Sequence, residues 1–116
     1  MKVVMQGATS VGANSTVNNV LSGEKYERPP GNSLGALYAT GSAAGLTCEL
    51  NVDGAAVSDT LTVNTQNRLP VVPDDLIIDE WEAPQGGLIQ LKASNSTGGA
   101  LTFNWRVELA EAEFVE

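Results

Sequence analysis

Carboxylates are the most numerous ionisable side chains of this sequence, with fourteen Asp and Glu against six Lys and Arg. Five of them lie close together, at Asp74, Asp75, Asp79, Glu80 and Glu82. Two carboxylates at a suitable separation can hydrolyse a glycosidic bond, and carboxylate oxygens are also the ligands that calcium prefers. Acids that alternate along a strand are, however, typical of a solvated sheet face, and this spacing does not match a glycine-containing calcium loop. We therefore expect neither a catalytic site nor a metal site.

The chain has no histidine, and its one cysteine is Cys48. The lack of histidine excludes the usual proton shuttle near neutral pH, the Ser-His-Asp and Cys-His nucleophile systems, and histidine metal sites. A lone cysteine forms no intramolecular disulfide and no thiolate cluster, so we expect a buried free thiol. The pairs Gly86-Gly87 and Gly98-Gly99 lack the spacing of a phosphate-binding loop. These absences predict a protein that is not an enzyme and binds no cofactor.

Length and charge restrict the partners of the chain. Its 116 residues suffice for one domain with a single core. Six basic and fourteen acidic residues give a net charge of -8, which repels phosphate backbones, so we expect no direct nucleic-acid binding. The apolar patch near the start is too short for a secretory signal, and no apolar run approaches a membrane span. We expect no membrane insertion, and synthesis in a reducing cytoplasm.

Strand patterns dominate the sequence. The surest strand covers 101–109, where alternate residues are apolar: Leu101, Phe103, Trp105, Val107 and Leu109. A second alternating strand covers 46–52, and Asp53-Gly54 then predicts a tight hairpin turn. The strand that returns from this turn should place Val57, Leu61 and Val63 on one side. A strand carrying Ile89, Leu91 and Ala93 inward should lie between two glycine-rich turns.

Other segments have weaker patterns. Residues 34–40 predict a weaker strand, and residues 1–6 a short edge strand. The apolar residues of 76–82 change sides partway, so we expect a β-bulge there. Residues 7–20 are small and polar with isolated valines, which is typical either of a thin strand or of an extended arm. Many short strands without amphipathic helices predict an all-β, antiparallel β-sandwich spanning residues 1–116 as one domain, with 1–30 as an N-terminal arm or an edge strand.

The segment from Leu69 to Pro73 combines apolar side chains with two prolines. Pro70 and Pro73 lack backbone donors and favour extended residues before them, so this segment belongs neither to a helix nor to a central strand. Burying Leu69, Val71 and Val72 would contribute roughly 1.5–3 kcal/mol each. Either they lie across the open end of their own sandwich, or they pack on a neighbouring subunit. The other candidate segment for packing on a neighbouring subunit contains Arg28, Pro29 and Pro30.

Taken together, these features resemble the single jelly-roll proteins that build virus and bacteriophage shells. The shared features are a small all-β body, a Gly/Ser/Asn/Thr-rich segment at residues 7–23, proline-containing connectors and absent catalytic chemistry. The resemblance implies a single jelly roll of about eight short strands. It also implies a capsid, vertex or decoration subunit, located in the virion, that assembles with copies of itself and with other virion proteins through contacts of its arm and loops. Residues 1–23 carry one lysine, whereas shell proteins that bind the genome often have a basic arm.

A different class remains open from the sequence. A carbohydrate-binding or immunoglobulin-like ligand-binding module would also be a small β-sandwich. That class requires an exposed aromatic platform, for which Trp81 is the candidate, because we expect Trp105 to belong to the core. Strand order does not follow from the sequence, so a jelly roll and an immunoglobulin-like sandwich are not separated at this level.

Overall fold

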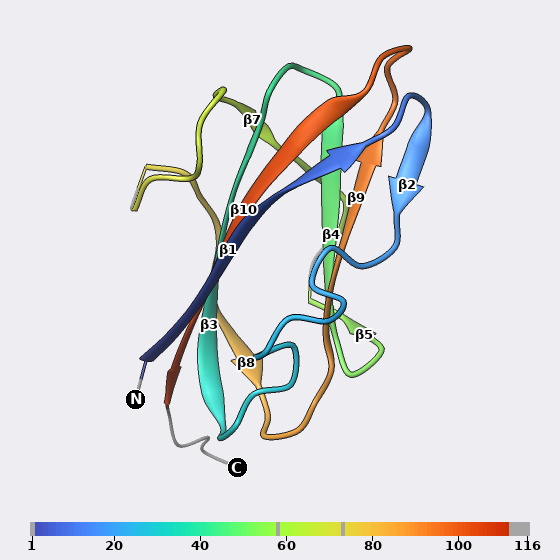
Figure 1. Ribbon diagram of the computed structural model, residues 1–116. Coiled ribbons are helices and arrows are strands. Elements are labelled where there is room, and N and C mark those ends of the chain that lie inside the picture. The colour runs from blue at the N-terminus through green and yellow to red at the C-terminus, as the bar shows by residue number, and fades with distance from the viewer. Residues whose placement is uncertain (1, 58, 73, 112–116) are drawn as a thin grey trace.

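The computed structural model describes residues 2–57, 59–72 and 74–111, which form two packed β-sheets (Figure 1). Sheet A contains β1 (Lys2–Val11), β10 (Leu101–Glu111), β3 (Ser33–Gly41) and β8 (Leu76–Ala83), with the short β7 (Asn64–Thr65) also on β3. Sheet B contains β2 (Ser15–Val17), β9 (Ile89–Asn95) and β4 (Leu46–Val52), with β5 (Ala55–Ala56) and β6 (Leu61–Thr62) both paired to β4. Within these ranges no helix is long and apolar enough to span a membrane.

The strand order is that of a jelly roll. The first half of the chain runs antiparallel to the second: β1 pairs with β10, β2 with β9, β3 with β8, and β4 with β5 and β6. This folded ribbon rolls up so that β10 also pairs with β3 and β9 with β4. An immunoglobulin-like sandwich would place the first two strands in one sheet, whereas β1 and β2 lie in different sheets. The predicted antiparallel β-sandwich is confirmed, and its topology is the two-sheet jelly roll.

The inward rows of β10, β4 and β9 form the core between the sheets. The alternation predicted for 101–109 is confirmed, since Phe103, Trp105, Val107 and Leu109 are all buried. The row of β4 buries Leu46, Cys48, Leu50 and Val52, and that of β9 buries Ile89, Leu91 and Ala93. The strand predicted to return after Asp53-Gly54 is less regular than expected, because it is divided into the two-residue strands β5 and β6.

Each tryptophan lies over a glycine of the neighbouring strand. Trp105 of β10 is paired with Gly7 of β1, and Trp81 of β8 is paired with Gly35 of β3. A Cβ built on Gly7 would lie 2.9 Å from Cζ2 of Trp105, and one built on Gly35 would be closer still to the Trp81 ring. The absent side chain leaves room for the indole, so each pair fills one layer of the core.

Strand β8 contains the predicted bulge and a second irregularity. Its register with β3 shifts between Gly35 and Ala36 and again between Leu37 and Tyr38. The first shift leaves Glu80 without a partner, and its φ of 54° lies in the left-handed region. The two shifts resolve the ambiguous pattern of 76–82, because Trp81 and Ala83 are buried while Asp79 and Glu80 are exposed.

The segment for which the sequence predicts an arm or an edge strand holds β1 and β2. β1 is longer than the expected strand at residues 1–6 and pairs with β10 from Lys2 to Val11. The chain then crosses to sheet B, where Ser15–Val17 pairs with β9. The connection to β3 packs on the β8–β9 turn, where Ile89 N–H donates to Glu27 O (2.8 Å) and Gly86 N–H to Pro29 O (3.0 Å).

Candidate interaction surfaces

The five acids singled out by the sequence do not converge on one site. Asp74, Asp79, Glu80 and Glu82 are exposed, whereas Asp75 is buried at the base of a loop. Among the described residues, no group of three or more His, Cys, Asp or Glu side chains is placed to hold a metal ion. The acids therefore form no shared binding centre in the described part of the chain.

Cys48 is the buried free thiol that the sequence predicts. Burial, with a smaller contribution from the charge of Glu49, raises the pKa of the Cys48 thiol from 9.0 to about 12. Because the thiolate is the nucleophilic form, this cysteine is unreactive near neutral pH.

The connector between β7 and β8 is a loop tied firmly to strand β3. We call it the anchored loop and define it as residues 66–72 and 74–75. Gln66 N–H donates to Gly41 O (3.1 Å), the Thr40 hydroxyl to Arg68 O (2.5 Å), and Ala39 N–H to Asp75 O (3.2 Å). Thr40 faces outward from sheet A and is bonded to the loop. The loop therefore covers the end of the sheet where Thr40 lies. Both Thr40 and its neighbour Asn104 are buried.

The buried Asp75 holds the anchored loop together through its contacts with Val71 and Arg68. Its Oδ2 accepts a hydrogen bond from Val71 N–H (2.8 Å) and pairs with Arg68 Nη2 (3.3 Å), and its own N–H donates to Val71 O (3.0 Å). An acid that accepts backbone hydrogen bonds in this way holds a turn without secondary structure. The described residues of the loop therefore have a defined shape.

The anchored loop presents aliphatic side chains to solvent. Leu69, Val71 and Val72 are 46%, 41% and 45% exposed, while Pro70 between them is buried. Their own sandwich therefore covers these three side chains only in part. Pro73, which belonged to the same expectation, lies outside the described residues.

The second proline segment sits differently. Arg28 Nη1 donates to Gly86 O (2.7 Å), Pro29 is buried, and Pro30 is exposed. Arg28 and Pro29 thus pack on the β8–β9 turn of their own chain, which leaves Pro30 as the apolar residue of this trio at the surface.

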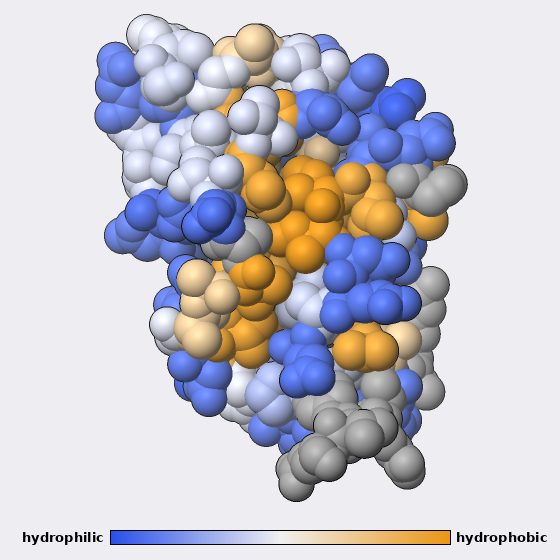
Figure 2. Space-filling model, turned by 180° about the vertical axis from the view of Figure 1, so that it is seen from behind, coloured by the Kyte–Doolittle hydropathy of each residue, from blue (hydrophilic) through white to orange (hydrophobic). Residues whose placement is uncertain are grey.

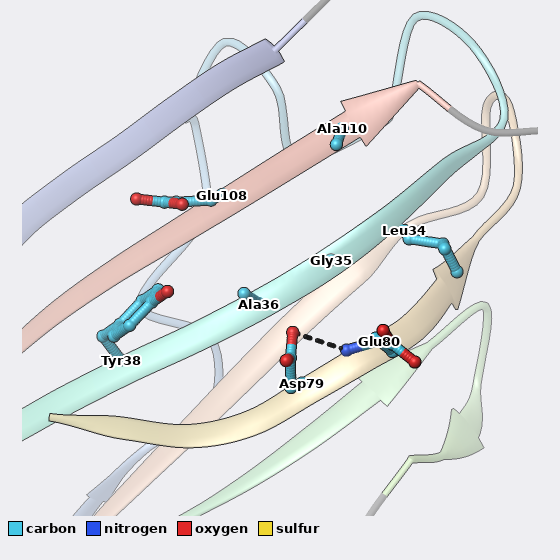
Figure 3. Close-up of a pocket in the computed structure, with 8 residues that line it drawn as sticks. All are labelled: Leu34, Gly35, Ala36, Tyr38, Asp79, Glu80, Glu108 and Ala110. Carbon is cyan, nitrogen blue, oxygen red and sulfur yellow. Dashed lines mark hydrogen bonds between the residues drawn. The ribbon is translucent and has the colours of Figure 1, made fainter. Parts of the chain in front are cut away.

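The outer face of sheet A carries a shallow hollow of about 320 Å³ (Figure 3). Ala36 and Gly35 form its floor, and the side chains of Tyr38, Glu108, Asp79 and Leu34 stand around them. Exposed aliphatic residues of the same face are Val4, Leu34 and Leu76. The outward row of sheet B is polar by contrast, with Thr47, Glu49 and Asn51 on β4 and Gln90, Lys92 and Ser94 on β9.

The sequence reading did not identify this outer face, although a signal was present. Residues 34–40 are apolar or small at outward positions such as Leu34 and Ala36 as well as at inward ones such as Leu37 and Ala39. A strand that is apolar on both sides is typical of one covered on both faces. On this face Arg106 Nε donates to Glu108 (2.7 Å) and Arg106 Nη1 to Gln6 (3.0 Å), while Asp79 and Glu80 beside the hollow are exposed.

A second hollow lies on the open side of the sandwich, between β8 and the β4–β5 hairpin. We call it the open-side hollow; its volume is about 390 Å³, and it is lined by Val52, Asp53, Ala55, Ala56, Val57, Trp81, Glu82 and Pro84. Seen from behind, the molecule shows a broad apolar area bordered by hydrophilic side chains (Figure 2). Leu61 on β6 and Ile77 and Ile78 on β8 are only partly buried.

Trp81 belongs to the core and does not form a surface platform. It is 4% exposed, so the exposed aromatic platform that a carbohydrate-binding module requires is not present at Trp81. The expectation that Trp105 is a core residue is confirmed, since it is 2% exposed. The two indoles differ in one respect: Trp105 Nε1 lies 3.5 Å from Thr9 Oγ1, whereas Trp81 Nε1 is buried without a hydrogen-bond partner among the described residues.

Comparison with known proteins yields one structural likeness. No family model matches the chain, and no curated protein matches its sequence. A solved chain from the structure described as "Structure of infectious bursal disease virus Gx strain" aligns with 94% of this chain at 17% sequence identity and a TM-score of 0.37. This chain spans 31% of the length of that one. A likeness of this degree carries no argument about function.

Proposed function

We propose that this chain is a non-enzymatic structural protein of a virus or bacteriophage particle. In this proposal it is a capsid, vertex or decoration subunit that assembles through loop contacts with copies of itself and with other virion proteins. The proposal that the chain belongs to a virus or bacteriophage particle is supported by the jelly-roll topology together with the sequence features that resemble shell proteins. The proposal that the chain assembles with other subunits is supported by the anchored loop.

The observation that carries assembly is the exposure of Leu69, Val71 and Val72 on a loop that is held in place. Covering aliphatic surface that is now in water is favourable by about 25 cal/mol per Å². The contacts of Asp75 with Val71 and Arg68 already fix the loop, so a partner need not order it, and less of the binding energy is lost to ordering.

Charge favours protein partners over the genome. The net charge of -8 opposes direct contact with phosphates. β1 and β2 occupy the part of the chain where a basic arm would be needed, and residues 1–23 contain a single lysine. Contacts with nucleic acid are therefore assigned to other components of the particle.

Sedimentation velocity over a wide concentration range tests the assembly. We expect the purified chain to form defined oligomers or particles above its 12.1 kDa monomer mass. The variant Val71→Ser/Val72→Ser, which changes two exposed side chains, should stay folded and shift the distribution toward the monomer. A matched control is Ser10→Ala, an exposed position on β1. A 12.1 kDa monomer at every concentration would refute the proposed function.

A further inference from the structure

We propose that β1 pairs with the β1 strand of a second copy of this chain, antiparallel and about a two-fold axis. Sheet A then continues from one molecule into the next. β1 is an outer strand of sheet A, and β10 is its only strand partner in the described part of the chain (Figure 1). The inference goes beyond the proposed function, because the contact is a sheet edge and not the anchored loop.

The free edge of β1 carries the main-chain N–H and C=O groups of its even-numbered residues. Ala39 N–H donates to Asp75 O, so the odd-numbered residues of β3 point away from β10. Main-chain bonds alternate between the two sides of an antiparallel strand, and the registers of β3 with β10 and of β10 with β1 are unbroken. Even residues of β3 therefore bond to even residues of β10, and odd residues of β10 to odd residues of β1. The groups that face away from β10, to which no described residue bonds through its main chain, include those of Val4, Gln6, Ala8 and Ser10.

β1 lacks most of the features by which proteins protect an exposed sheet edge, which are short strands, bulges, prolines and charged side chains. It has 10 residues in unbroken register, contains no proline and no acid, and carries its one charged residue, Lys2, at its end. The other outer strands of the described chain are protected. β8 has two register shifts and the exposed acids Asp79, Glu80 and Glu82, β2 has 3 residues, and β5 and β6 have 2 each.

A second β1 strand fits this edge in a register that matches the free groups. When Gln6 lies on the two-fold axis, it faces Gln6 of the other copy. Val4 of each copy then faces Ala8 of the other, and Lys2 faces Ser10. All of these are even-numbered residues, so each pair exchanges two N–H···O=C bonds, as opposite residues of an antiparallel ladder do.

Charge favours a second copy of β1 at this edge. The net charge of -8 makes copies of this chain repel one another in general. Residues 3–11 carry no charge, and the two-fold register places no like charges opposite each other. β1 is therefore a segment at which two such chains can meet without repulsion, and two-fold contacts are the commonest between identical chains.

The strand is already in the shape that a partner requires. Val3 and Met5 are buried in the core and hold β1 against the sandwich, so little binding energy is lost to ordering it. The outward side chains of Val4, Gln6, Ala8 and Ser10 are exposed and uncharged. Strand pairing alone covers less surface than the roughly 1,200–2,000 Å² of a stable interface. We therefore expect a reversible dimer at high protein concentration.

The test uses full-length chains that all carry Val71→Ser/Val72→Ser, so that the anchored loop does not contribute. We call this the background chain. The lysine variant adds Val4→Lys/Ala8→Lys, and the glutamate variant adds Val4→Glu/Ala8→Glu, both at exposed positions. Each places like charges opposite each other at both Val4–Ala8 pairs of the dimer. The controls, Ala56→Lys/Thr62→Lys and Ala56→Glu/Thr62→Glu, make the same changes of charge at exposed positions of β5 and β6.

Sedimentation velocity measures the dimerisation of each chain. We expect the lysine variant and the glutamate variant each to dimerise at least about 5-fold more weakly than the background chain. An equimolar mixture of the two should dimerise at least as tightly as the background chain, because lysine then faces glutamate at both pairs. The two control variants, alone or mixed, should show no such difference beyond the effect of net charge. Circular dichroism checks that every variant is folded.

Amide hydrogen exchange followed by NMR shows which groups the contact covers. In the background chain, the amides of Gln6 and Ala8 should exchange quickly at low concentration. Where about four-fifths of the chain is dimeric, exchange from the remaining monomer alone should be about 5-fold slower. The amides of Met5 and Gly7, which bond to β10, should exchange slowly at both concentrations and are the internal control.

The outcomes separate this inference from the proposed function. If the parent chain assembles while the background chain is monomeric at every concentration, the proposed function stands and the β1 contact is refuted. If the parent and background chains form the same dimer, and the lysine and glutamate variants weaken it, the β1 contact stands and the anchored loop is not an assembly surface. A mixture that dimerises no better than its separate variants, or Gln6 and Ala8 amides whose exchange does not depend on concentration, overturns the two-fold pairing.

Discussion

Replacing Gly35 by alanine tests how closely the Trp81 indole packs over the neighbouring strand of sheet A. Gly35 is the third residue of β3 and pairs with Trp81, and its φ is not in the left-handed region. The added methyl therefore meets no backbone strain and changes only the packing. A Cβ at this position would lie 2.5 Å and 2.6 Å from Cε2 and Cη2 of the Trp81 ring, well inside the limit of about 3.0 Å below which real Cβ contacts essentially do not occur.

We expect Gly35→Ala to lower the free energy of unfolding by about 1–3 kcal/mol, because the buried indole must leave its preferred position to admit the methyl. Gly98→Ala is the matched control, since nothing lies within 4 Å of its built Cβ and its φ is also outside the left-handed region. That change should be neutral or stabilising by up to about 1 kcal/mol through the unfolded chain. Urea unfolding followed by circular dichroism measures both.

A double-mutant cycle tests whether the Trp81 indole causes the loss of stability in Gly35→Ala. Trp81→Phe removes one ring, so Gly35→Ala should cost less in that background, with a coupling of about 0.5–3 kcal/mol. If Gly35→Ala is as stable as Gly98→Ala, or if its cost is unchanged in the Trp81→Phe chain, the account of an indole that occupies the space of a missing side chain is wrong.

Three further predictions follow from buried polar groups. Asp75→Ala should lower the free energy of unfolding by about 1–3 kcal/mol and speed proteolysis in the anchored loop, because Val71 N–H loses its acceptor; the exposed Asp74→Ala should change stability by less than about 0.5 kcal/mol. Cys48 should resist a thiol reagent in the native chain at about pH 8 and react on unfolding. Because the pKa of its thiol is about 12 when folded and 9.0 ordinarily, its contribution to stability should be lost as pH rises through that interval. Asn95→Asp should destabilise more than Asn95→Ser in thermal melts, because Nδ2 donates to two backbone carbonyls that a carboxylate would repel.

The strands that were easiest to predict are those whose own side chains fill the core. The segment 101–109 presents a large apolar residue at each inward position, so its period of two is visible without knowledge of its neighbours. The weak signals of β1 and β3 have one physical cause. Their inward positions include Gly7 and Gly35, and indoles from the adjacent strands occupy the space above both. The apolar group that fills each of these inward positions comes from another strand. The alternation of apolar and polar residues is therefore interrupted in the sequences of β1 and β3.

The interaction surfaces were predictable only in part. Prolines and aliphatic residues mark 69–73 as a connector with apolar surface, and this needs no tertiary information. The buried Asp75 that fixes the connector is not distinguishable in the sequence from the exposed Asp74 beside it. The open-side hollow joins residues near 53 to residues near 82, and no local pattern reports which distant segments a jelly roll brings together.

The pairing of β1 with β10 has a consequence for the order in which the molecule forms. Residues 2–11 find their only long hydrogen-bonded neighbour, as far as the structure describes it, at residues 101–110, which leave the ribosome long after them. Contacts of such long range make folding slow and keep the first strand waiting in water during synthesis. Within this strand, residues 6–10 carry no bulky aliphatic side chain, and such a stretch has little tendency to aggregate before its neighbour is made.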